Sequence, residues 1–479
     1  MLGAGVTISR TLQLVRYMIM ARLLVPSQLG LMAIVLAATT LFETIFEVGI
    51  KQSVIQSKRG DREEYLNVAW WFQAVRGFGL FVIAFMAAPA VSWFYDKPEL
   101  LYLLRVTFLA LVFKGLMSPV TYVLEKKFQF QKVVYLTQGS SLLGTLLTIV
   151  LAFFLRNIWA LVIGFVFEAF LLSLLSFIIC PFLPRLSIKR DCLDEILRFS
   201  RGMFGIPILT LIAFQTDIFV LGKLAPLAVV GTYSMAVSLS QVPRSYYVRI
   251  FSPLLLPAFS RKQDDEKYLC GTALKMTNAT AIFGLPLAAF CVVCAGAILS
   301  IALGNQYATA AVPFGLFSIY AVVRIQESTL SSIYLAIGRP HLHRCFVALR
   351  AAILVCLIYP AVVFFGSTGA AASVLIAELS GLCAQVIWMQ KRMGLKLSRY
   401  ISCWVPGLYL AQIVVVPGTL LVLLGHSSTI VNLVTGGVLY FLSCGLGIIL
   451  LRGWPKKSAT AQAKSREFDI NLEAKTKYA

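Results

Sequence analysis

The chain has 479 residues, of which 59% are hydrophobic and only 13% are charged, and its formal net charge is +21. Soluble globular chains are about 45–50% apolar and about 25% charged, so this composition excludes a water-soluble enzyme, whose core could not hold so much apolar surface. With 33 Gly, 18 Pro and 10 Cys, the composition also excludes collagen, a disordered chain and a small disulfide-stapled domain.

The apolar runs predict an all-α polytopic membrane protein, because a helix needs about 20 apolar residues to cross a bilayer. We expect fourteen spans, at 3–24, 29–50, 67–94, 100–124, 133–155, 158–183, 202–222, 229–257, 276–303, 310–337, 345–366, 369–389, 402–424 and 430–451. The first run contains Arg10 and Arg16 and has neither a basic leader nor a small-residue cleavage site. It therefore predicts a retained span rather than a signal peptide.

The basic residues predict how the spans are oriented. One alternate set of loops, with the tail, carries 29 Lys and Arg, whereas the opposite set carries only Arg22, Lys97, Arg156 and Lys223. Positive loops stay in the cytoplasm, so we expect both termini there. The excess charge is expected to contact anionic phospholipids. A nucleic-acid partner is not expected, because no basic run is interleaved with aromatic residues.

The spans predict two six-helix lobes around a central cavity, followed by an extra helix pair. We expect an N-lobe at 1–200, a C-lobe at 201–400, extra spans 13 and 14 within 401–451, and a solvated cytoplasmic tail at 452–479. Between the lobes, residues 188–200 place Ile188, Cys192, Ile196 and Phe199 on one helical face. This pattern predicts a short amphipathic helix on the cytoplasmic surface.

A weak internal repeat supports this division. When the chain is shifted by 201 residues, Ala-Arg-Leu-Leu-Val-Pro-Ser-Gln-Leu-Gly at 21–30 aligns with Gly-Lys-Leu-Ala-Pro-Leu-Ala-Val-Val-Gly at 222–231. Six spans per half give the halves the same orientation, which predicts a pseudo-two-fold axis along the membrane normal and a ligand site between the lobes. The alternative is that the two segments are merely similar helix-end turns.

Charged residues inside the spans are the main functional signal, because each costs about 2.5–3.5 kcal/mol at the bilayer centre and should face a wet cavity or a partner. Polar stripes in spans 1, 2, 8 and 10, together with the in-span Arg76 of span 3, predict a substrate cavity formed by Arg10, Gln13, Arg16, Arg76, Gln241, Arg244, Arg249 and Arg324. The repeat aligns Arg16 with Asp217 and Glu43 with Arg244, which predicts electrostatically complementary lobes. The alternative is a structural role in charge pairs, favoured for Arg350, Arg105, Glu168 and Glu378.

The excess of arginine over acid predicts an anionic ligand. Guanidinium stays charged and binds phosphate through two parallel hydrogen bonds, so converging arginines suit a phosphate or diphosphate. The acids Glu43, Glu47, Asp217 and Glu327 are either sites for coupling to H+ or Na+ or structural partners of the arginines. We expect no cofactor, metal or catalytic residue, because His341 and His343 lack a third ligand and Cys291 and Cys294 lie in an apolar helix.

Several motifs resemble a known family. They are Phe-Glu-Val-Gly-Ile at 46–50, which follows the 21–30 segment, and Thr-Asp-Ile-Phe-Val-Leu-Gly-Lys-Leu at 216–224. Two more are Val-Gly-Thr-Tyr-Ser-Met-Ala at 230–236 and Leu-Leu-Leu-Pro-Ala-Phe-Ser-Arg at 254–261. Together they resemble the polysaccharide transporter branch of the MOP superfamily, especially the colanic-acid and O-antigen (Wzx-like) flippases.

This resemblance implies a function. It implies a non-enzymatic, multi-pass flippase of the bacterial inner (cytoplasmic) membrane, which carries an undecaprenyl-diphosphate-linked oligosaccharide to the outer leaflet by alternating access. The implied partners are the polyprenyl-diphosphate-linked glycan and polysaccharide polymerase or export proteins. Two alternatives stay open. One is a multidrug or ion antiporter of the same superfamily, and the other is a membrane glycosyltransferase or polymerase.

Overall fold

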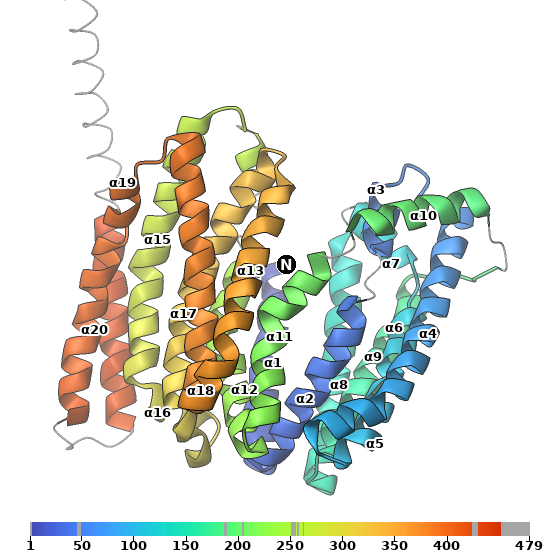
Figure 1. The fold of residues 1–479 in the computed structure, drawn as a ribbon, viewed down its shortest axis with the longest axis horizontal. Helices are drawn as coiled ribbons and strands as arrows, with labels where there is room; N and C mark the ends of the chain where they lie inside the picture. Colours follow the sequence, from blue (N-terminus) through green and yellow to red (C-terminus); the bar gives the residue numbers. More distant parts are fainter. Residues whose placement is uncertain are drawn as a thin grey trace, which may run out of the picture.

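The computed structural model describes residues 2–45, 49–127, 129–185, 189–203, 206–250, 255, 258–261, 263–423 and 430–451. All regular secondary structure in these ranges is helical. Figure 1 shows the helices in two groups: α2–α10 of the N-terminal half in one, and the C-terminal half (α11–α20 and a final helix) in the other, with α1 drawn behind α11. The expected all-α membrane architecture is confirmed.

The N-terminal half is built from long helices joined by short ones. Its helices are α1 (Leu2–Leu23), α2 (Pro26–Ile45), α3 (Ile50–Gln56), α4 (Glu63–Tyr95), α5 (Glu99–Thr107), α6 (Leu109–Gly115), α7 (Val120–Lys126), α8 (Phe130–Leu155), α9 (Trp159–Ile179) and α10 (Arg190–Met203). α8 packs against α1 and α9, and α6 packs against α4 and α9. Proline begins α2, where its missing N–H costs nothing because the first helical N–H groups have no partner.

The C-terminal half repeats this construction with longer helices. Its elements are α11 (Ile206–Leu224), α12 (Leu227–Ser240), α13 (Val242–Ile250), α15 (Glu266–Val293), α16 (Ala295–Ala302), the 3-10 helix η1 (Asn305–Ala310), α17 (Ala311–Ala336), α18 (Pro340–Met393), α19 (Leu397–Ser402), α20 (Val405–Leu423) and a final helix Ile430–Leu451. α17 packs against α15 and α18, and α20 packs against α15.

Nine helices in the described ranges are long and apolar enough to cross a membrane, and a bent α5–α7 unit makes up to ten. α18 contains a break at Gly366, whose φ of 57° is in the left-handed region that glycine tolerates. Beyond the break the chain folds back, because Arg350 contacts Glu378 at 2.8 Å although 28 residues separate them. This reversal corresponds to the predicted boundary between 345–366 and 369–389, and the set of helices is consistent with fourteen spans.

Two predicted spans are not continuous helices. Over 100–124, the chain bends by 61° between α6 and α7. Backbone carbonyls at such a bend need new donors inside a membrane, and Gln73 and Trp70 of α4 supply them by donating to the carbonyls of residues 114–117. The predicted span 229–257 is likewise interrupted, at Gln241 between α12 and α13.

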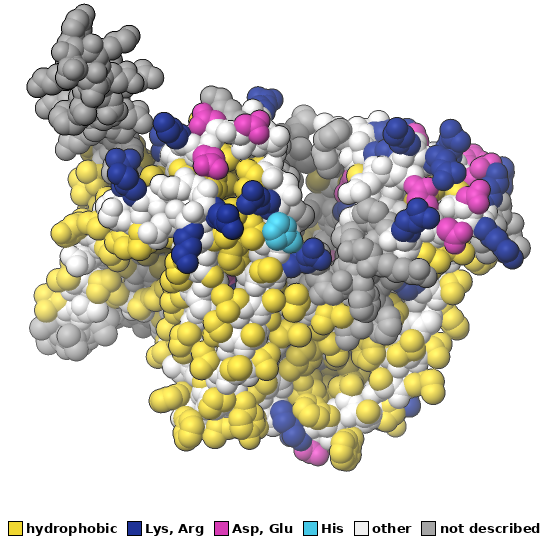
Figure 2. Space-filling model, turned by 45° about the horizontal axis from the view of Figure 1, so that its top comes forward, with side chains coloured by type: hydrophobic (Ala, Val, Ile, Leu, Met, Phe, Trp, Pro, Cys, Tyr) yellow, Lys and Arg dark blue, Asp and Glu magenta, His cyan; other side chains and the backbone are white. Residues whose placement is uncertain are grey.

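Charge divides the surface into bands. Figure 2 shows most of the charged side chains along one end of the molecule, with apolar side chains covering the flank below. We call this the basic end; α3, α10 and α19 lie there in Figure 1. We call the other the opposite end; there α4 meets α5 and α11 meets α12. An apolar belt between two polar ends is the surface that a bilayer requires.

The predicted amphipathic helix is α10, at the basic end. Cys192 and Ile196 are buried with Val54 of α3 and Tyr65 of α4, which confirms the predicted apolar face for these two residues. Ile188 lies outside the described residues, and the side chain of Phe199 is not described. The hydrogen bond from Ser57 and the charge of Arg59 hold the pKa of Glu195 below its usual range. The stabilisation that the contacts of Glu195 with Ser57 and Arg59 give to α10 is therefore fully present at neutral pH. It is lost as the pH falls through that lowered pKa.

We expect Ile196→Asp to detach α10 from the bundle. The substitution removes about 1.5–3 kcal/mol of apolar burial and places a carboxylate among apolar side chains. Trypsin cleavage within 185–201 in membrane vesicles should become several-fold faster. Asp194→Ala is the control, because Asp194 is exposed on the same helix and its replacement keeps every trypsin site in the segment. Equal cleavage of both variants would contradict the packing.

Candidate functional site

The two halves meet mainly through α2, which contacts α11 and α12. α1 also crosses to the C-terminal half, where it contacts α12 and α13. Of these helices, α1, α2, α12 and α13 belong to spans 1, 2 and 8, for which the sequence predicts polar stripes. Their contact brings the polar faces of both halves toward the same region of the bundle.

A cavity of about 240 Å³ lies between the halves. Its walls come from α1, α2, α8 and α9 on one side and from α11 and α12 on the other. Its polar lining residues are Arg16, Tyr17, Thr40, Thr148, Gln215, Ser234 and Ser238. The hollow expected between the halves is therefore present, with an arginine in its wall.

Arg16 reaches this cavity from α1 but does not contact its repeat counterpart. Its Nη1 lies 3.6 Å from Oε2 of Glu168, and its guanidinium lies over the ring of Tyr17 at 5.5 Å. Asp217 is instead buried in the C-terminal half, where the hydroxyl of Tyr233 donates to its Oδ2 at 2.7 Å. Arg16 is held by one carboxylate and remains partly accessible from the cavity.

Arg244 and Gln241 continue the polar stripe of α12 toward the basic end. Nη1 of Arg244 lies 3.4 Å from Oε1 of Gln241, and its buried Nε has no hydrogen-bond partner. No carboxylate oxygen lies within 4 Å of Arg244 in the part of the chain that is described. A half-buried guanidinium with only an amide partner has unused capacity to bind an anion.

The predicted acids have different partners. Glu43 accepts from Nζ of Lys114 at 2.6 Å, so its partner lies within its own half and is not Arg244. Glu47 lies outside the described residues. Asp217 has a hydroxyl donor and, over the described ranges, no basic group within 4 Å. Among the predicted acids that the structure describes, Asp217 is therefore the buried carboxylate that lacks a cation.

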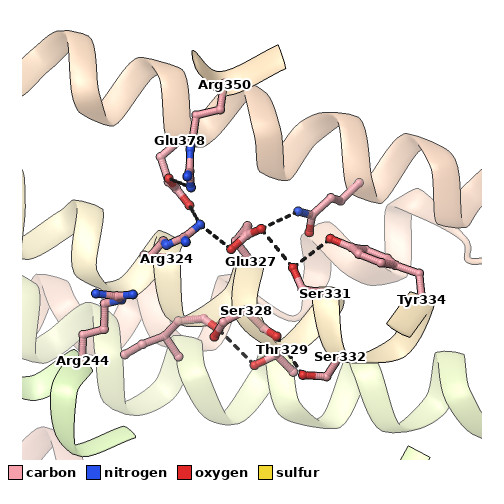
Figure 3. Close-up of polar contacts among 12 residues, drawn as sticks. Arg244, Arg324, Glu327, Ser328, Thr329, Ser331, Ser332, Tyr334, Arg350 and Glu378 are labelled. Carbon is pink, nitrogen blue, oxygen red and sulfur yellow. Dashed lines mark hydrogen bonds and ion pairs between the residues drawn. The ribbon is translucent and has the colours of Figure 1, made fainter. Parts of the chain in front are cut away.

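Arg324 belongs to a buried polar network rather than to the cavity wall. Its Nη1 donates to Oε2 of Glu327 at 2.5 Å and to Oε1 of Glu378 at 3.1 Å. Arg350 donates to the other oxygen of Glu378 at 2.8 Å, as Figure 3 shows. Gln385 and Ser331 donate to the remaining oxygen of Glu327. Both carboxylates are thus fully engaged, which ties α17 to both arms of α18.

Phe214 of α11 completes this network, and no pattern in the sequence predicted its role. Its ring lies 4.8 Å from the guanidinium carbon of Arg324 and 4.7 Å from that of Arg350. Gln385 and Lys114 are also partners that the polar stripes did not identify. A lone glutamine in an apolar run is the kind of signal that would have identified Gln385, because an unsatisfied amide is costly in lipid.

The other predicted site residues are placed as follows. Gln13 is half-buried on α1, and Arg76 is half-buried on α4, a helix that does not line the cavity. Arg10 and Arg249 belong to α1 and α13, and their side chains are not described. In the described ranges, no three His, Cys, Asp or Glu side chains are close enough to hold a metal ion. Cys294 is buried and donates to the carbonyl of Asn432 at 3.4 Å.

Comparison with known proteins decides the family. The profile of a family described as "polysaccharide biosynthesis protein" matches residues 19–312. The chain belongs to this polysaccharide biosynthesis protein family. The matched segment includes α2, α11 and α12, so it covers most of the cavity wall. The expected membership of a polysaccharide family is confirmed.

Curated relatives of this family member are bacterial polysaccharide biosynthesis proteins. The lipopolysaccharide biosynthesis protein WzxC of Escherichia coli (strain K12) is 23% identical over 403 residues, which cover 82% of this chain and 81% of WzxC. The succinoglycan biosynthesis transport protein ExoT of Rhizobium meliloti (strain 1021) is 25% identical over 312 residues, which cover 64% of this chain and 62% of ExoT.

Solved structures share the fold. The lipid II flippase MurJ in an inward closed conformation superposes with a TM-score of 0.77 at 12% identity, covering 93% of this chain and 98% of that one. An inward-facing MATE family multidrug resistance transporter of the MOP superfamily gives a TM-score of 0.62 at 14% identity, covering 80% and 94%. At these identities the likeness concerns the fold alone.

Proposed function

We propose that this polysaccharide biosynthesis protein moves an undecaprenyl-diphosphate-linked oligosaccharide from the inner to the outer leaflet of the bacterial cytoplasmic membrane by alternating access. The observation that carries the proposal is the cavity between the halves, which has Arg16 in its wall. Arg244 lies outside this lining, on α13, a helix that contacts α1. The relatives support it, because WzxC and ExoT are described as lipopolysaccharide and succinoglycan biosynthesis proteins. The protein acts as a transporter and not as an enzyme.

The orientation follows from the charge of the two ends. The basic end faces the cytoplasm, because its loops and the tail carry 29 Lys and Arg under the fourteen-span topology, whereas the loops of the opposite end carry four. Both termini then lie in the cytoplasm. In this orientation the substrate enters from the basic end, where its diphosphate meets Arg244 before it reaches Arg16.

The arginines replace water around the diphosphate. An unpaired anion in hydrocarbon is prohibitively costly, whereas charge-assisted hydrogen bonds from guanidinium compensate for lost hydration. Arg244 provides the stronger site because it has no carboxylate partner among the described residues. Arg16 contributes once its contact with Glu168, already 3.6 Å long, opens. Arg324 supports the C-terminal half instead, because Glu327 and Glu378 occupy its guanidinium.

The cavity is too small for the whole substrate in this conformation. Ligand pockets usually measure about 300–1,000 Å³, whereas this cavity of about 240 Å³ accommodates little more than the phosphorylated head group. The sugars therefore need the halves to move apart, and the polyprenyl chain stays in lipid. An interior-negative membrane potential favours outward movement of the anion by about 2.3 kcal/mol per charge per 100 mV.

Asp217 is the acid best placed to couple transport to H+ or Na+. It is buried, its hydrogen bond comes from a neutral hydroxyl, and no cation lies within 4 Å of it over the described ranges. Glu43 and Glu327 are paired with Lys114 and Arg324 and serve as structural partners.

A multidrug antiporter is the second candidate function for this protein, because a MATE transporter shares the fold.

The proposal is tested with purified protein in lipid vesicles. We expect the protein to move a fluorescent polyprenyl-diphosphate oligosaccharide between leaflets, measured by quenching with an impermeant reductant. A polyprenyl-monophosphate oligosaccharide of the same glycan should move several-fold more slowly, because it offers fewer anionic oxygens to the arginines. Protein-free vesicles and a cationic dye are the controls. Transport of the dye without transport of the glycan lipid would contradict the proposal and favour the antiporter.

A further inference from the structure

The two repeated segments, 21–30 and 222–231, lie against each other at the opposite end of the molecule, below the cavity. Gly30 of α2 and Gly231 of α12 are aligned by the repeat and touch each other. A Cβ on Gly30 would lie 2.0 Å from the carbonyl oxygen of Leu227, and one on Gly231 would lie 1.8 Å from that of Pro26. The backbones of α2 and α12 therefore approach as closely as glycine permits.

Two basic side chains cross between the halves beside this contact. Arg22 of the N-terminal half donates from Nη2 to the carbonyl of Ile301 at 2.5 Å. Lys223 of the C-terminal half donates from Nζ to Oδ2 of Asp96 at 2.6 Å. The repeat aligns Arg22 with Lys223, so the two crossing contacts are related by the same pseudo-symmetry as the two glycines.

Further contacts seal the same end. Gln306 of η1 donates to the carbonyl of Ala21 at 3.3 Å, and the hydroxyl of Tyr95 donates to the carbonyl of Phe219 at 3.4 Å. Ile34 of α2 and Leu221 of α11 are both fully buried in an apolar cluster shared by the two halves. Two hydrogen bonds and shared apolar packing therefore join the halves between the cavity and the opposite end.

We propose that the repeated segments form a symmetric latch, with Arg22 and Lys223 as its crossing side chains and Gly30 and Gly231 as its pivot, which closes the outer exit of the cavity. This inference rests on the proposed function, which makes the opposite end the side on which the substrate leaves. The latch must open for a substrate to leave and must stay closed while the cavity is open to the cytoplasm. The latch therefore determines from which side of the membrane the cavity is accessible, and it makes no contact with the substrate.

The exposure of the ion pair suits a contact that opens in each cycle. The side chain of Asp96 is 75% exposed and that of Lys223 is 36% exposed. Ion pairs with this exposure are screened by water and are individually weak, so they can be broken and remade easily. The contact between Gly30 and Gly231 differs from the ion pair in that it tolerates no side chain. A side chain added at either glycine would push against backbone atoms that cannot move aside.

The test measures access to the cavity from outside. Ser238→Cys places a thiol in the cavity wall, and its labelling by a membrane-impermeant maleimide in right-side-out vesicles is compared with that of the parent, which keeps only the natural cysteines. With Lys223→Asp, two carboxylates face each other at the latch, so we expect labelling to become several-fold faster. The exchanged pair Lys223→Asp with Asp96→Lys should restore slow labelling. Lys97→Asp is the matched control, because Lys97 makes no ion pair in the described residues.

A second variant tests the pivot without changing any charge. Gly30→Ala should also increase labelling, because its methyl group separates α2 from α12, whereas Gly79→Ala should not, because a Cβ there meets nothing within 4 Å. Thermal denaturation of the purified variants verifies folding. Unchanged labelling in folded Lys223→Asp and Gly30→Ala would overturn the latch and leave the transport proposal intact. A normal labelling response without glycan-lipid transport would overturn the proposed function and not the latch.

Discussion

Replacing Arg244 with alanine is expected to abolish movement of the diphosphate-linked glycan while the protein still folds and inserts. The side chain has no carboxylate partner among the described residues, so its removal leaves no buried acid unpaired. The diphosphate, in contrast, loses a half-buried guanidinium on its proposed path to the cavity. Losing one partner of such a pair costs about 2–5 kcal/mol, which corresponds to a rate at least about 30-fold lower. The measurement is the initial rate of leaflet exchange in vesicles.

Two further variants sharpen this experiment. Arg16→Ala should also reduce transport, although it releases Glu168 from its ion pair and so carries a structural cost as well. Arg105→Ala is the matched control, because Arg105 is another arginine within a span but lies on α5 over the ring of Phe85, away from the cavity lining. Full activity of both Arg16→Ala and Arg244→Ala would remove the proposed diphosphate site.

Replacing Glu378 with leucine is expected to destabilise the C-terminal half severely. The side chain of Glu378 is 1% exposed and accepts hydrogen bonds from both Arg324 and Arg350. Without it, Arg350 has no carboxylate within 4 Å in the described ranges, and two guanidiniums remain close to the ring of Phe214. Breaking a buried pair in this way costs about 3–5 kcal/mol. Thermal denaturation of the detergent-purified protein, followed by size-exclusion chromatography, measures the loss.

The double variant Glu378→Leu with Arg350→Met separates a buried charge from lost packing. Removing both partners leaves no orphaned guanidinium at position 350, so the double variant should be clearly more stable than Glu378→Leu alone. Lys51→Ala is the control. Its ion pair with Glu125 is exposed and should contribute about 0–1 kcal/mol. A double variant no more stable than the single one would show that packing, and not charge, dominates at this position.

The polar faces of the helices could be predicted because helical phase is a local property. Arg324, Glu327 and Ser331 recur at spacings of three and four residues, and in the structure they meet in one network. The same reasoning predicted Cys192 and Ile196 as the buried face of α10. In each example the residues lie within two turns of one helix, so no knowledge of neighbouring helices was needed.

The partners of the charged residues could not be predicted in this way. The repeat aligns Arg16 with Asp217 and Glu43 with Arg244, whereas the structure pairs Arg16 with Glu168 and Glu43 with Lys114. Alignment in a repeat relates equivalent positions in two halves and does not place them in contact. Contact depends on which helices become neighbours. For Arg16 this is decided in its own half, where α1 packs against α8 and α8 packs against α9, the helix that carries Glu168.

The repeated segments illustrate the same division. The similarity of 21–30 and 222–231 is visible in the sequence, but their direct contact through Gly30 and Gly231 is a property of the assembled halves. Composition, apolar runs and loop charge determined by themselves that this protein is a helical membrane protein with polar faces, because transfer from water to lipid acts on each segment separately. Only the tertiary structure decided which charges pair, where the cavity lies and how its far end closes, because these depend on the packing of segments distant in the chain.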